Sequence, residues 1–216
     1  MKRSVPPARK LMGTLAPPAD KSVSHRAAIL NSLAAGEAVI DNYSEGADCR
    51  ATLRCLRLLG VSAEKVTPEE GSTEAPRLKL SSPGLENFRE PNDVLNAENS
   101  GTTMRFLVGL LGSTPFLSVI TGDRSLRSRP MGRVVQPLRL MGAQVMGRGG
   151  DSLAPLAIRG GNLKGIEYTL PVASAQLKAS LVIAALFAQG ETVLYQPALS
   201  RDHTERMVEA MGASLT

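Results

Sequence analysis

Three segments of the chain share one pattern of hydrophobic and polar positions. Each opens with small hydroxyl-bearing residues and a cation or an amide, and continues with apolar residues three or four positions apart, as on one face of a helix. The segments read KSVSHRAAILNSLAAGEAVI from Lys21, NSGTTMRFLVGLLGSTPFLSVI from Asn99 and ASAQLKASLVIAALFAQGETVL from Ala173. A glycine and a short stretch with β-branched residues follow, so each segment predicts a helix and then a strand.

A second predicted helix follows in each segment, and the three helices end alike. They read TLRCLRLLGVSA, QPLRLMGAQV and RMVEAMGASL, and a strand begins directly after the glycine. Gly60, Gly142 and Gly212 occupy the position where a left-handed residue commonly closes a helix. Pro137 lies inside the middle helix and predicts a kink there.

These elements predict three copies of one unit: helix, strand, loop, helix, strand and hairpin. The strands RLKLSS and LAIRG return in the first and second units, whereas the third unit stops at GASLT, before any return strand. We expect residues 1–19 to lie outside the repeat, and residues 20–216 to form a three-unit domain whose third unit is truncated. If the units pack around a pseudo-threefold axis, their equivalent ends meet at one face.

The composition restricts the partners of such a protein. The 216 residues are 43% hydrophobic, enough for a substantial core, and the net charge of +5 favours an anionic ligand. Aromatic residues make up 3% of the chain, without Trp, so stacking surfaces for nucleic acid are scarce. No apolar run reaches the ~18–20 residues of a membrane span. Cys49 and Cys55 favour core thiols in a reducing compartment, so we expect a cytoplasmic protein without a membrane partner.

Polar residues cluster where the predicted helices begin. The stretch DKSVSHR precedes the first helix; an N-cap by Ser22 or Ser24 explains only part of it, because a cap needs neither Lys21 nor Arg26. Cations at a helix N-terminus oppose the helix dipole unless an anion lies between them and the backbone amides. Equivalent positions hold Asn99, Gly101, Thr102, Arg105, Ser174 and Gln176, and the loops before the second helices hold Asp48, Arg127, Arg129, Ser200, Arg201 and His203. This recurrence predicts one shared anion-binding region.

Each of these features also has a purely structural interpretation. The loop from Asp123 to Arg139 holds five arginines and one carboxylate, which alone is typical of a solvated face. His25 and His203 suit helix ends, and without a third histidine or a cysteine pair at metal spacing the sequence predicts no metal site. Asp48 fits an N-cap as well as a functional carboxylate.

Five motifs resemble, in order and in spacing, those of the 5-enolpyruvylshikimate-3-phosphate (EPSP) synthase family. They are DKSVSHRA, NSGTTMRFL, GDRSLRSRPMGRVVQPLRLMGA, PVASAQLKASLVIAAL and SRDHTERM, and they extend over the whole chain. The resemblance implies an α/β fold of repeated βαβαββ units around a pseudo-threefold axis, an inside-out α/β barrel that is one of the family's two domains. It also implies an enzyme of the shikimate pathway, which transfers the enolpyruvyl group of phosphoenolpyruvate to the 5-hydroxyl of shikimate 3-phosphate.

The resemblance assigns roles to individual residues. One set would bind shikimate 3-phosphate: Lys21, Ser22, Arg26, Ser174, Ala175, Gln176, Ser200 and Arg201. Within it, Ser174, Ser200 and the backbone of Ala175 would hold the phosphate group, and Gln176 would lie along the ring. Gly101 and Arg129 match contacts to phosphoenolpyruvate, and Lys21 and Asp48 match residues near the reacting centre. No cofactor or metal is implied, and the full-length enzyme is expected to be a monomer.

The chain departs from the family pattern in three ways. Glu98 stands where many members have Gly, and Phe106 stands where others have Pro, so either would reshape the phosphoenolpyruvate pocket. The chain also resembles only the N-terminal half, with residues 1–19 as a strand that belongs in the family to the other domain. Most of the family's acid–base groups lie in the second half, so we expect a fragment that binds weakly and does not turn over.

Two alternatives remain open. UDP-N-acetylglucosamine enolpyruvyl transferases usually carry a cysteine in the loop before the middle Arg-Pro, and GDRSLRSRP has none. A non-catalytic module that binds nucleic acid or another anion would suit the charge of +5, although few aromatics and scattered basic residues count against it.

Overall fold

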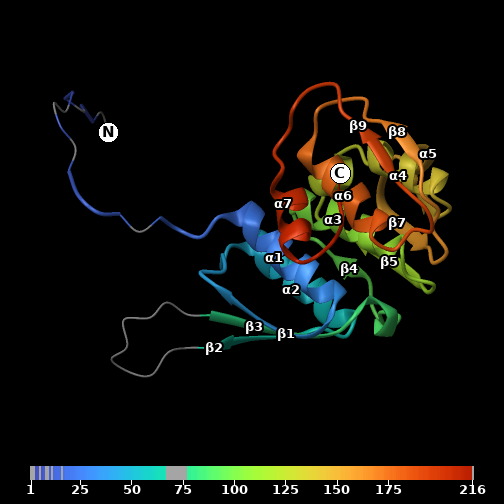
Figure 1. Cartoon of the computed structure of the whole chain (residues 1–216), viewed down its shortest axis with the longest axis horizontal. Coiled ribbons are helices and arrows are strands. Elements are labelled where there is room, and N and C mark those ends of the chain that lie inside the picture. The colour runs from blue at the N-terminus through green and yellow to red at the C-terminus, as the bar shows by residue number, and fades with distance from the viewer. Residues whose placement is uncertain are drawn as a thin grey trace.

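The computed structural model of the chain describes residues 3–4, 6–7, 10, 12–15, 17–66 and 77–215. The expectation for residues 1–19 therefore lies partly outside the described residues. Residues 12–15 and 17–20 form no helix or strand. The body of the protein begins at Lys21 (Figure 1).

The first unit has the predicted order of elements. Helix α1 (Lys21–Leu33) leads to strand β1 (Ala35–Asp41), helix α2 (Ala47–Leu58), strand β2 (Ser62–Val66) and strand β3 (Arg77–Pro83). Strand β3 lies between β1 and β2 and is antiparallel to both. Gly60 has a φ of +106°, which agrees with the predicted helix closure.

The second unit repeats this topology with one additional strand. A short 3-10 turn (Leu85–Asn87) leads to β4 (Leu95–Asn96), α3 (Gly101–Leu111) and β5 (Leu117–Thr121). A second 3-10 turn (Leu126–Ser128) precedes α4 (Gly132–Leu140), β6 (Gln144–Gly147), α5 (Arg148–Asp151) and β7 (Leu153–Arg159). Strand β7 lies between β5 and β6, antiparallel to both, and β4 runs parallel to β5 at the edge. Helix α4 runs through Pro137 and ends at Leu140.

The third unit contains β8 (Glu167–Thr169), α6 (Ala175–Ala185), β9 (Val193–Tyr195) and α7 (His203–Ala210). Strands β8 and β9 are parallel, as β4 and β5 are in the second unit. Within the described residues β9 has β8 as its one neighbour, and no strand occupies the place that β3 and β7 take in the other units.

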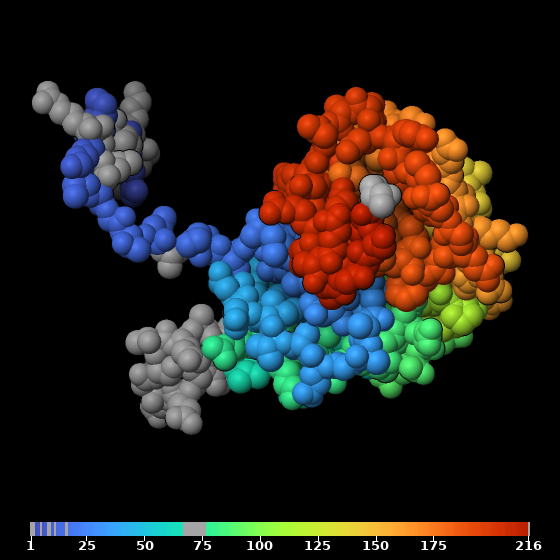
Figure 2. Space-filling model, in the orientation of Figure 1, coloured from blue at the N-terminus to red at the C-terminus, as the bar shows by residue number. Residues whose placement is uncertain are grey.

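The helices fill the interior, and the three sheets lie on the outside (Figure 1). Helix α2 packs against α3, α4 against α6, and α7 against α1, so each unit contacts the next and the third returns to the first. Figure 2 shows the units as adjoining blocks, blue to green, green to yellow and orange to red. Helix α3 is buried along most of its length, and a Cβ at Gly109 would lie 2.2 Å from the Ser180 carbonyl oxygen. Glycine there permits the close approach of α3 to α6.

Side chains cap the first helix of every unit, and one cap differs from the prediction. The Asp20 Oδ1 atom accepts from the Val23 amide at 2.7 Å, so Asp20 caps α1 in place of Ser22 or Ser24. Ser100 caps α3, and Ser174 caps α6. The Asp20 carboxylate accepts the capping hydrogen bond at the position before the helix, so the Ser22 hydroxyl is not needed as the cap of α1.

Candidate active site

The predicted convergence of helix starts is present in the structure. A cavity of about 380 Å³ is lined by residues from all three units: Ser22, Arg26, Thr102, Ala173, Ser174, Ala175, Gln176, Leu199, Ser200 and Arg201. The starts of α1, α3 and α6 border it together with the loop before α7. Because each helix N-terminus presents free amides and a positive dipole end, this cavity favours an anion.

Arg26 is built into this cavity and is 4% exposed. Its Nε atom donates to Thr204 Oγ1 at 2.7 Å, and an amino group donates to the Ser22 carbonyl at 3.0 Å. The guanidinium lies 5.0 Å from the centre of the Phe106 ring. Burial lowers the pKa of Arg26, while the nearby carboxylate of Glu205 opposes that effect. These contacts fix the orientation of the guanidinium before any ligand arrives.

Gln176 and Arg105 form the boundary of the cavity toward α3. Gln176 Nε2 donates to Thr102 Oγ1 at 2.9 Å, and its Oε1 accepts from Arg105 at 3.3 Å. A Cβ at Gly101 would lie 2.7 Å from an Arg105 nitrogen and 3.2 Å from an Arg129 nitrogen. Glycine at position 101 therefore lets both guanidinium groups pack close to the start of α3.

Arg129 lies beside this boundary on the loop before α4. Its guanidinium donates to Asn99 Oδ1 at 2.8 Å, and Asn99 Nδ2 donates to Asp123 Oδ2 at 2.6 Å. The Asn99 bond and backbone amides hold the pKa of Asp123 below its usual value. The pKa of Arg105 is lowered by burial first and then by the charges of Arg129 and Arg133. An anion among these guanidinium groups would relieve their mutual repulsion.

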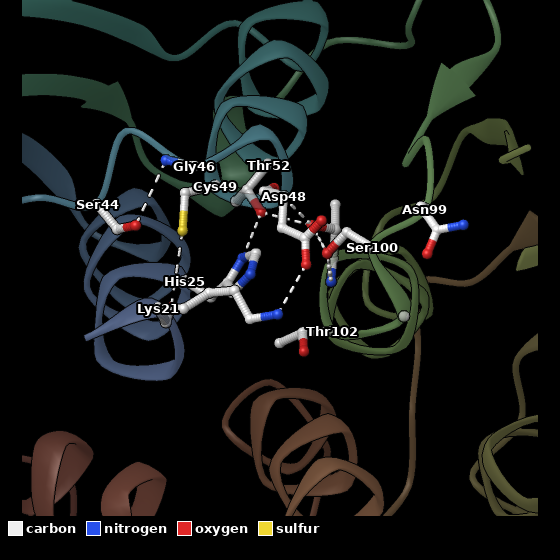
Figure 3. Close-up of polar contacts among 12 residues, drawn as sticks. Lys21, His25, Ser44, Gly46, Asp48, Cys49, Thr52, Asn99, Ser100 and Thr102 are labelled. Atoms are coloured by element: carbon white, nitrogen blue, oxygen red, sulfur yellow. Dashed lines mark hydrogen bonds and ion pairs between the residues drawn. The ribbon is translucent and has the colours of Figure 1, made fainter. Parts of the chain in front are cut away.

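Lys21 and Asp48 form an ion pair at the starts of α1 and α2, 2.9 Å between Nζ and Oδ2 (Figure 3). The side chain of Lys21 is 58% exposed and that of Asp48 is 30% exposed, so a ligand can reach both. Gly46 holds the N-cap position of α2, and Asp48 lies within the first turn. The interpretation of Asp48 as an N-cap is therefore wrong.

A second polar network supports the loop that carries Ser200. The buried Lys178 ammonium forms an ion pair with Glu205 and lies 3.4 Å from Gln196 Oε1. The same Gln196 oxygen accepts from the Ser200 hydroxyl at 3.0 Å. Sequence reasoning did not identify Lys178, Gln196 or Glu205 as site residues. The signal available for Lys178 was a cation inside an apolar helix, which indicates a paired charge when the helix is buried.

Arg201 and His203 are placed differently from each other. Arg201 is exposed at the cavity, whereas His203 is partly buried at the start of α7.

The two cysteines, Cys49 and Cys55, are free and buried, as predicted, and burial raises the pKa of the Cys55 thiol to about 12. Among the described residues no group of three or more His, Cys, Asp or Glu side chains could hold a metal ion. No helix within the described residues is long and apolar enough to cross a membrane.

A second cavity, of about 420 Å³, lies between α2 and the first sheet. Its lining includes Tyr43, Glu45, Arg50, Leu53, Arg54, Arg57, Lys65 and Arg77. Lys65 pairs with Glu45, Arg54 pairs with Glu98, and Arg57 donates to a backbone carbonyl. The described contacts therefore compensate much of its positive charge. The other cavity, by contrast, is lined by seven of the predicted site residues: Ser22, Arg26, Ser174, Ala175, Gln176, Ser200 and Arg201. The remaining four, Lys21, Asp48, Gly101 and Arg129, are not part of its lining.

The fold and the first cavity define a class of protein: a repeated α/β domain that directs helix N-termini and cations toward one shared cavity. The sequence model of the EPSP synthase (3-phosphoshikimate 1-carboxyvinyltransferase) family matches residues 5–216. The chain belongs to this family. The resemblance stated from the five motifs and the predicted fold class are confirmed.

Individual relatives agree with the family match. The chain is 52% identical over 211 residues to the 3-phosphoshikimate 1-carboxyvinyltransferase of Synechococcus sp. (strain JA-3-3Ab), covering 97% of this chain and 46% of that protein. It is 52% identical to the enzyme of the same name from Desulforudis audaxviator (strain MP104C), covering 99% of this chain and 48% of that protein. The EPSP synthase structure from Acinetobacter baumannii superposes with a TM-score of 0.86 at 43% identity, covering 94% of this chain and 44% of that one. The chain thus spans about half the length of the curated relatives that it matches.

Proposed function

We propose that this chain supplies one half of the active site of a 3-phosphoshikimate 1-carboxyvinyltransferase. In the proposed reaction, the 5-hydroxyl oxygen of shikimate 3-phosphate bonds to the enolpyruvyl group of phosphoenolpyruvate, and inorganic phosphate leaves. The observation that carries the proposal is the cavity in which all three units present helix N-termini beside Arg26 and Arg201. The UDP-N-acetylglucosamine alternative has no support among the relatives described above.

The proposed site of the shikimate phosphate is the part of the cavity at the start of α6. The Ser200 hydroxyl, the Ala175 amide and the exposed Arg201 line it, and Ser174 caps the helix there. A phosphate at this N-terminus would receive backbone amides, a hydroxyl and a guanidinium, the donors that such anions favour. Arg26 and Ser22 border the same cavity, and Gln176 lies across it toward α3.

The proposed site of phosphoenolpyruvate lies between Gly101, Arg129 and Lys21. The guanidinium groups of Arg129 and Arg105 both lie close to Gly101, and two such forked donors suit a small molecule that carries a carboxylate and a phosphate. Asp48 is paired with Lys21, so a ligand that takes up the ammonium would release a carboxylate beside the reacting atoms. We assign Lys21 and Asp48 to the reacting centre on this basis.

The test compares the chain alone with a completed site. The 216-residue chain is assayed for phosphate release from phosphoenolpyruvate with shikimate 3-phosphate, alone and mixed with the C-terminal half of the Synechococcus relative. We expect activity after mixing only, because lost acid–base catalysis costs ~10²–10⁴-fold and lost positioning costs more. Robust turnover by the chain alone would show that the catalytic groups are misassigned.

A binding measurement separates the enzyme from a nucleic-acid module. Shikimate 3-phosphate is titrated into the chain and into the variants Ser200→Ala and Ser62→Ala, the second altering an exposed serine on β2 as a control. We expect weaker binding for Ser200→Ala alone. Tight RNA binding with a steep salt dependence, without binding of shikimate 3-phosphate, would favour the nucleic-acid module.

We also propose that the full-length protein is a monomer without a nucleic-acid partner, and that it is cytoplasmic. The free thiols of Cys49 and Cys55 support the cytoplasmic location.

A further inference from the structure

A chain of buried polar side chains connects the first three helices beneath the Lys21–Asp48 pair. His25 Nδ1 lies 2.7 Å from Thr52 Oγ1, which lies 2.7 Å from Thr103 Oγ1. Thr103 Oγ1 in turn lies 2.7 Å from Ser100 Oγ. All four side chains, those of His25, Thr52, Thr103 and Ser100, are fully buried. We call these four residues the hydroxyl–imidazole chain; Figure 3 labels His25, Thr52 and Ser100.

The hydrogen bonds of this chain agree with a single direction. The Asp48 carbonyl oxygen, 3.3 Å from Thr103 Oγ1, can only accept. Thr103 therefore donates to that carbonyl or to Ser100, Thr52 donates to Thr103, and His25 Nδ1–H donates to Thr52. This direction leaves His25 Nε2 as an unprotonated acceptor, and that atom has no partner among the described residues.

The chain runs one helical turn below the residues assigned to the reacting centre. Lys21 and His25 are four residues apart on α1, and Asp48 and Thr52 are four residues apart on α2, so each pair shares a helix face. On α3 the chain ends at the Ser100 cap, directly before Gly101. The relative position of these three helix starts therefore depends on contacts within the hydroxyl–imidazole chain.

Packing alone would favour apolar side chains at these positions. A buried polar group without a partner costs ~1–3 kcal/mol, and His25 Nε2 is such a group. Apolar side chains of similar volume would fill the space without this cost. They would not, however, fix the position of each helix along and about its axis relative to the other two. Although His25 Nε2 has no partner, the hydrogen bonds between His25, Thr52, Thr103 and Ser100 are directional, so they favour one arrangement of α1, α2 and α3.

We infer that His25 and Thr52 are positioning residues, which hold the Lys21 ammonium and the Asp48 carboxylate in the geometry that receives phosphoenolpyruvate. This inference rests on the proposed function for its ligand and on the hydrogen-bond geometry for its mechanism. Neither residue touches the ligand; both act through the first turns of α1 and α2. Burial lowers the pKa of His25 to about 4, which keeps the ring neutral and the direction of the chain intact at neutral pH.

The test removes one hydroxyl with little change in shape. Thr52→Val breaks the chain, Thr52→Ser restores a hydroxyl, and Thr114→Val is the control. Thr114 is fully buried and donates to the Leu111 carbonyl at 2.9 Å, beyond the opposite end of α3. Affinity for phosphoenolpyruvate is measured in the 216-residue chain by NMR titration, together with urea unfolding of each variant.

We expect Thr52→Val to weaken phosphoenolpyruvate binding about tenfold, which lies within the range of interaction energies measured between residues in contact. Thr52→Ser should recover most of that loss, and Thr114→Val should lose stability without losing affinity. In a Lys21→Met background, Thr52→Val should have no further effect, because its action passes through Lys21. An equal loss in both backgrounds, or wild-type affinity in Thr52→Val, would overturn the inference.

A second readout needs no ligand. The ¹⁵N NMR signal of the Lys21 ammonium reports its pairing with Asp48, and we expect it to shift in Thr52→Val but not in Thr114→Val. An unchanged signal in Thr52→Val would contradict the positioning role. If the wild-type chain binds neither phosphoenolpyruvate nor shikimate 3-phosphate, the proposed function fails, while the ammonium signal still decides the role of the hydroxyl–imidazole chain.

Discussion

Acidification should destabilise this protein through His25 before its carboxylates titrate. The ring is fully buried, and its pKa is lowered from 6.5 to about 4. Burial is the largest cause; Lys21 and Arg26 act in the same direction, and Asp48 opposes them. Between pH 6.5 and 4 the unfolded chain binds a proton at His25 that the folded chain excludes. The free energy of unfolding therefore falls as the pH falls through this interval.

The size of the loss follows from the difference between the two pKa values. One pKa unit corresponds to about 1.4 kcal/mol, so a shift from 6.5 to about 4 corresponds to about 3 kcal/mol once the loss is complete. Most of it, about 2 kcal/mol, should be lost between pH 7 and pH 5. Typical domains are stable by ~5–15 kcal/mol, so this change is measurable.

The comparison with His25→Asn isolates this effect from other titrations. Asparagine keeps a polar group that can reach Thr52 Oγ1 but does not titrate, and His203 is present in both proteins. Urea unfolding at pH 7, 6, 5 and 4.5 gives the free energy of unfolding of each. We expect the wild-type advantage over His25→Asn to shrink by about 2 kcal/mol between pH 7 and 5. Parallel pH profiles of the two proteins would refute the reasoning.

Three further substitutions test the site. Arg129→Ala removes one partly exposed contact to Asn99, so the melting temperature should hardly change. The use of phosphoenolpyruvate by the completed enzyme should fall sharply. Unaltered kinetics would contradict the assignment of Arg129 to the phosphoenolpyruvate site. Arg26→Ala should instead lower the free energy of unfolding in urea by about 2–4 kcal/mol, because it removes the buried hydrogen bond to Thr204 and the cation–π contact with Phe106. A loss below about 1 kcal/mol would show that neither contact stabilises the fold. Glu98→Gly should change the free energy of unfolding by no more than about 1 kcal/mol from the wild-type value. Glycine relieves the strain of the left-handed backbone at this position (φ +52°), which offsets the loss of the exposed ion pair between Glu98 and Arg54. A larger drop would show that this ion pair contributes more to stability.

The elements of this fold could be predicted where they depend on neighbouring residues. Helix α1 begins at Lys21 and α6 at Ala175, where the apolar spacing indicated. Gly142 and Gly212 have positive φ angles, as predicted for residues that close helices. Short-range periodicity and backbone sterics decide these features, and both can be read within a few residues.

The prediction of helix caps was less successful because several candidates lay side by side. Asp20, Ser22 and Ser24 are all good N-cap residues, and the sequence pattern does not choose among them. The structure selects Asp20, and the Ser24 hydroxyl instead donates to the Asp20 carbonyl oxygen at 2.8 Å. The choice depends on where the chain enters the helix, which is set by packing beyond the first turn.

The sequence by itself determined the repeat, the helix starts and the kinds of side chain that gather there. Only the tertiary structure decided which of them meet. Lys21 and Asp48 are 27 residues apart, and Arg26 and Thr204 are 178 residues apart. The first pair forms because α1 packs on α2, and the second because α7 of the third unit packs back on α1 of the first. No pattern within a few residues encodes such contacts, because they exist only when the three units have packed against one another.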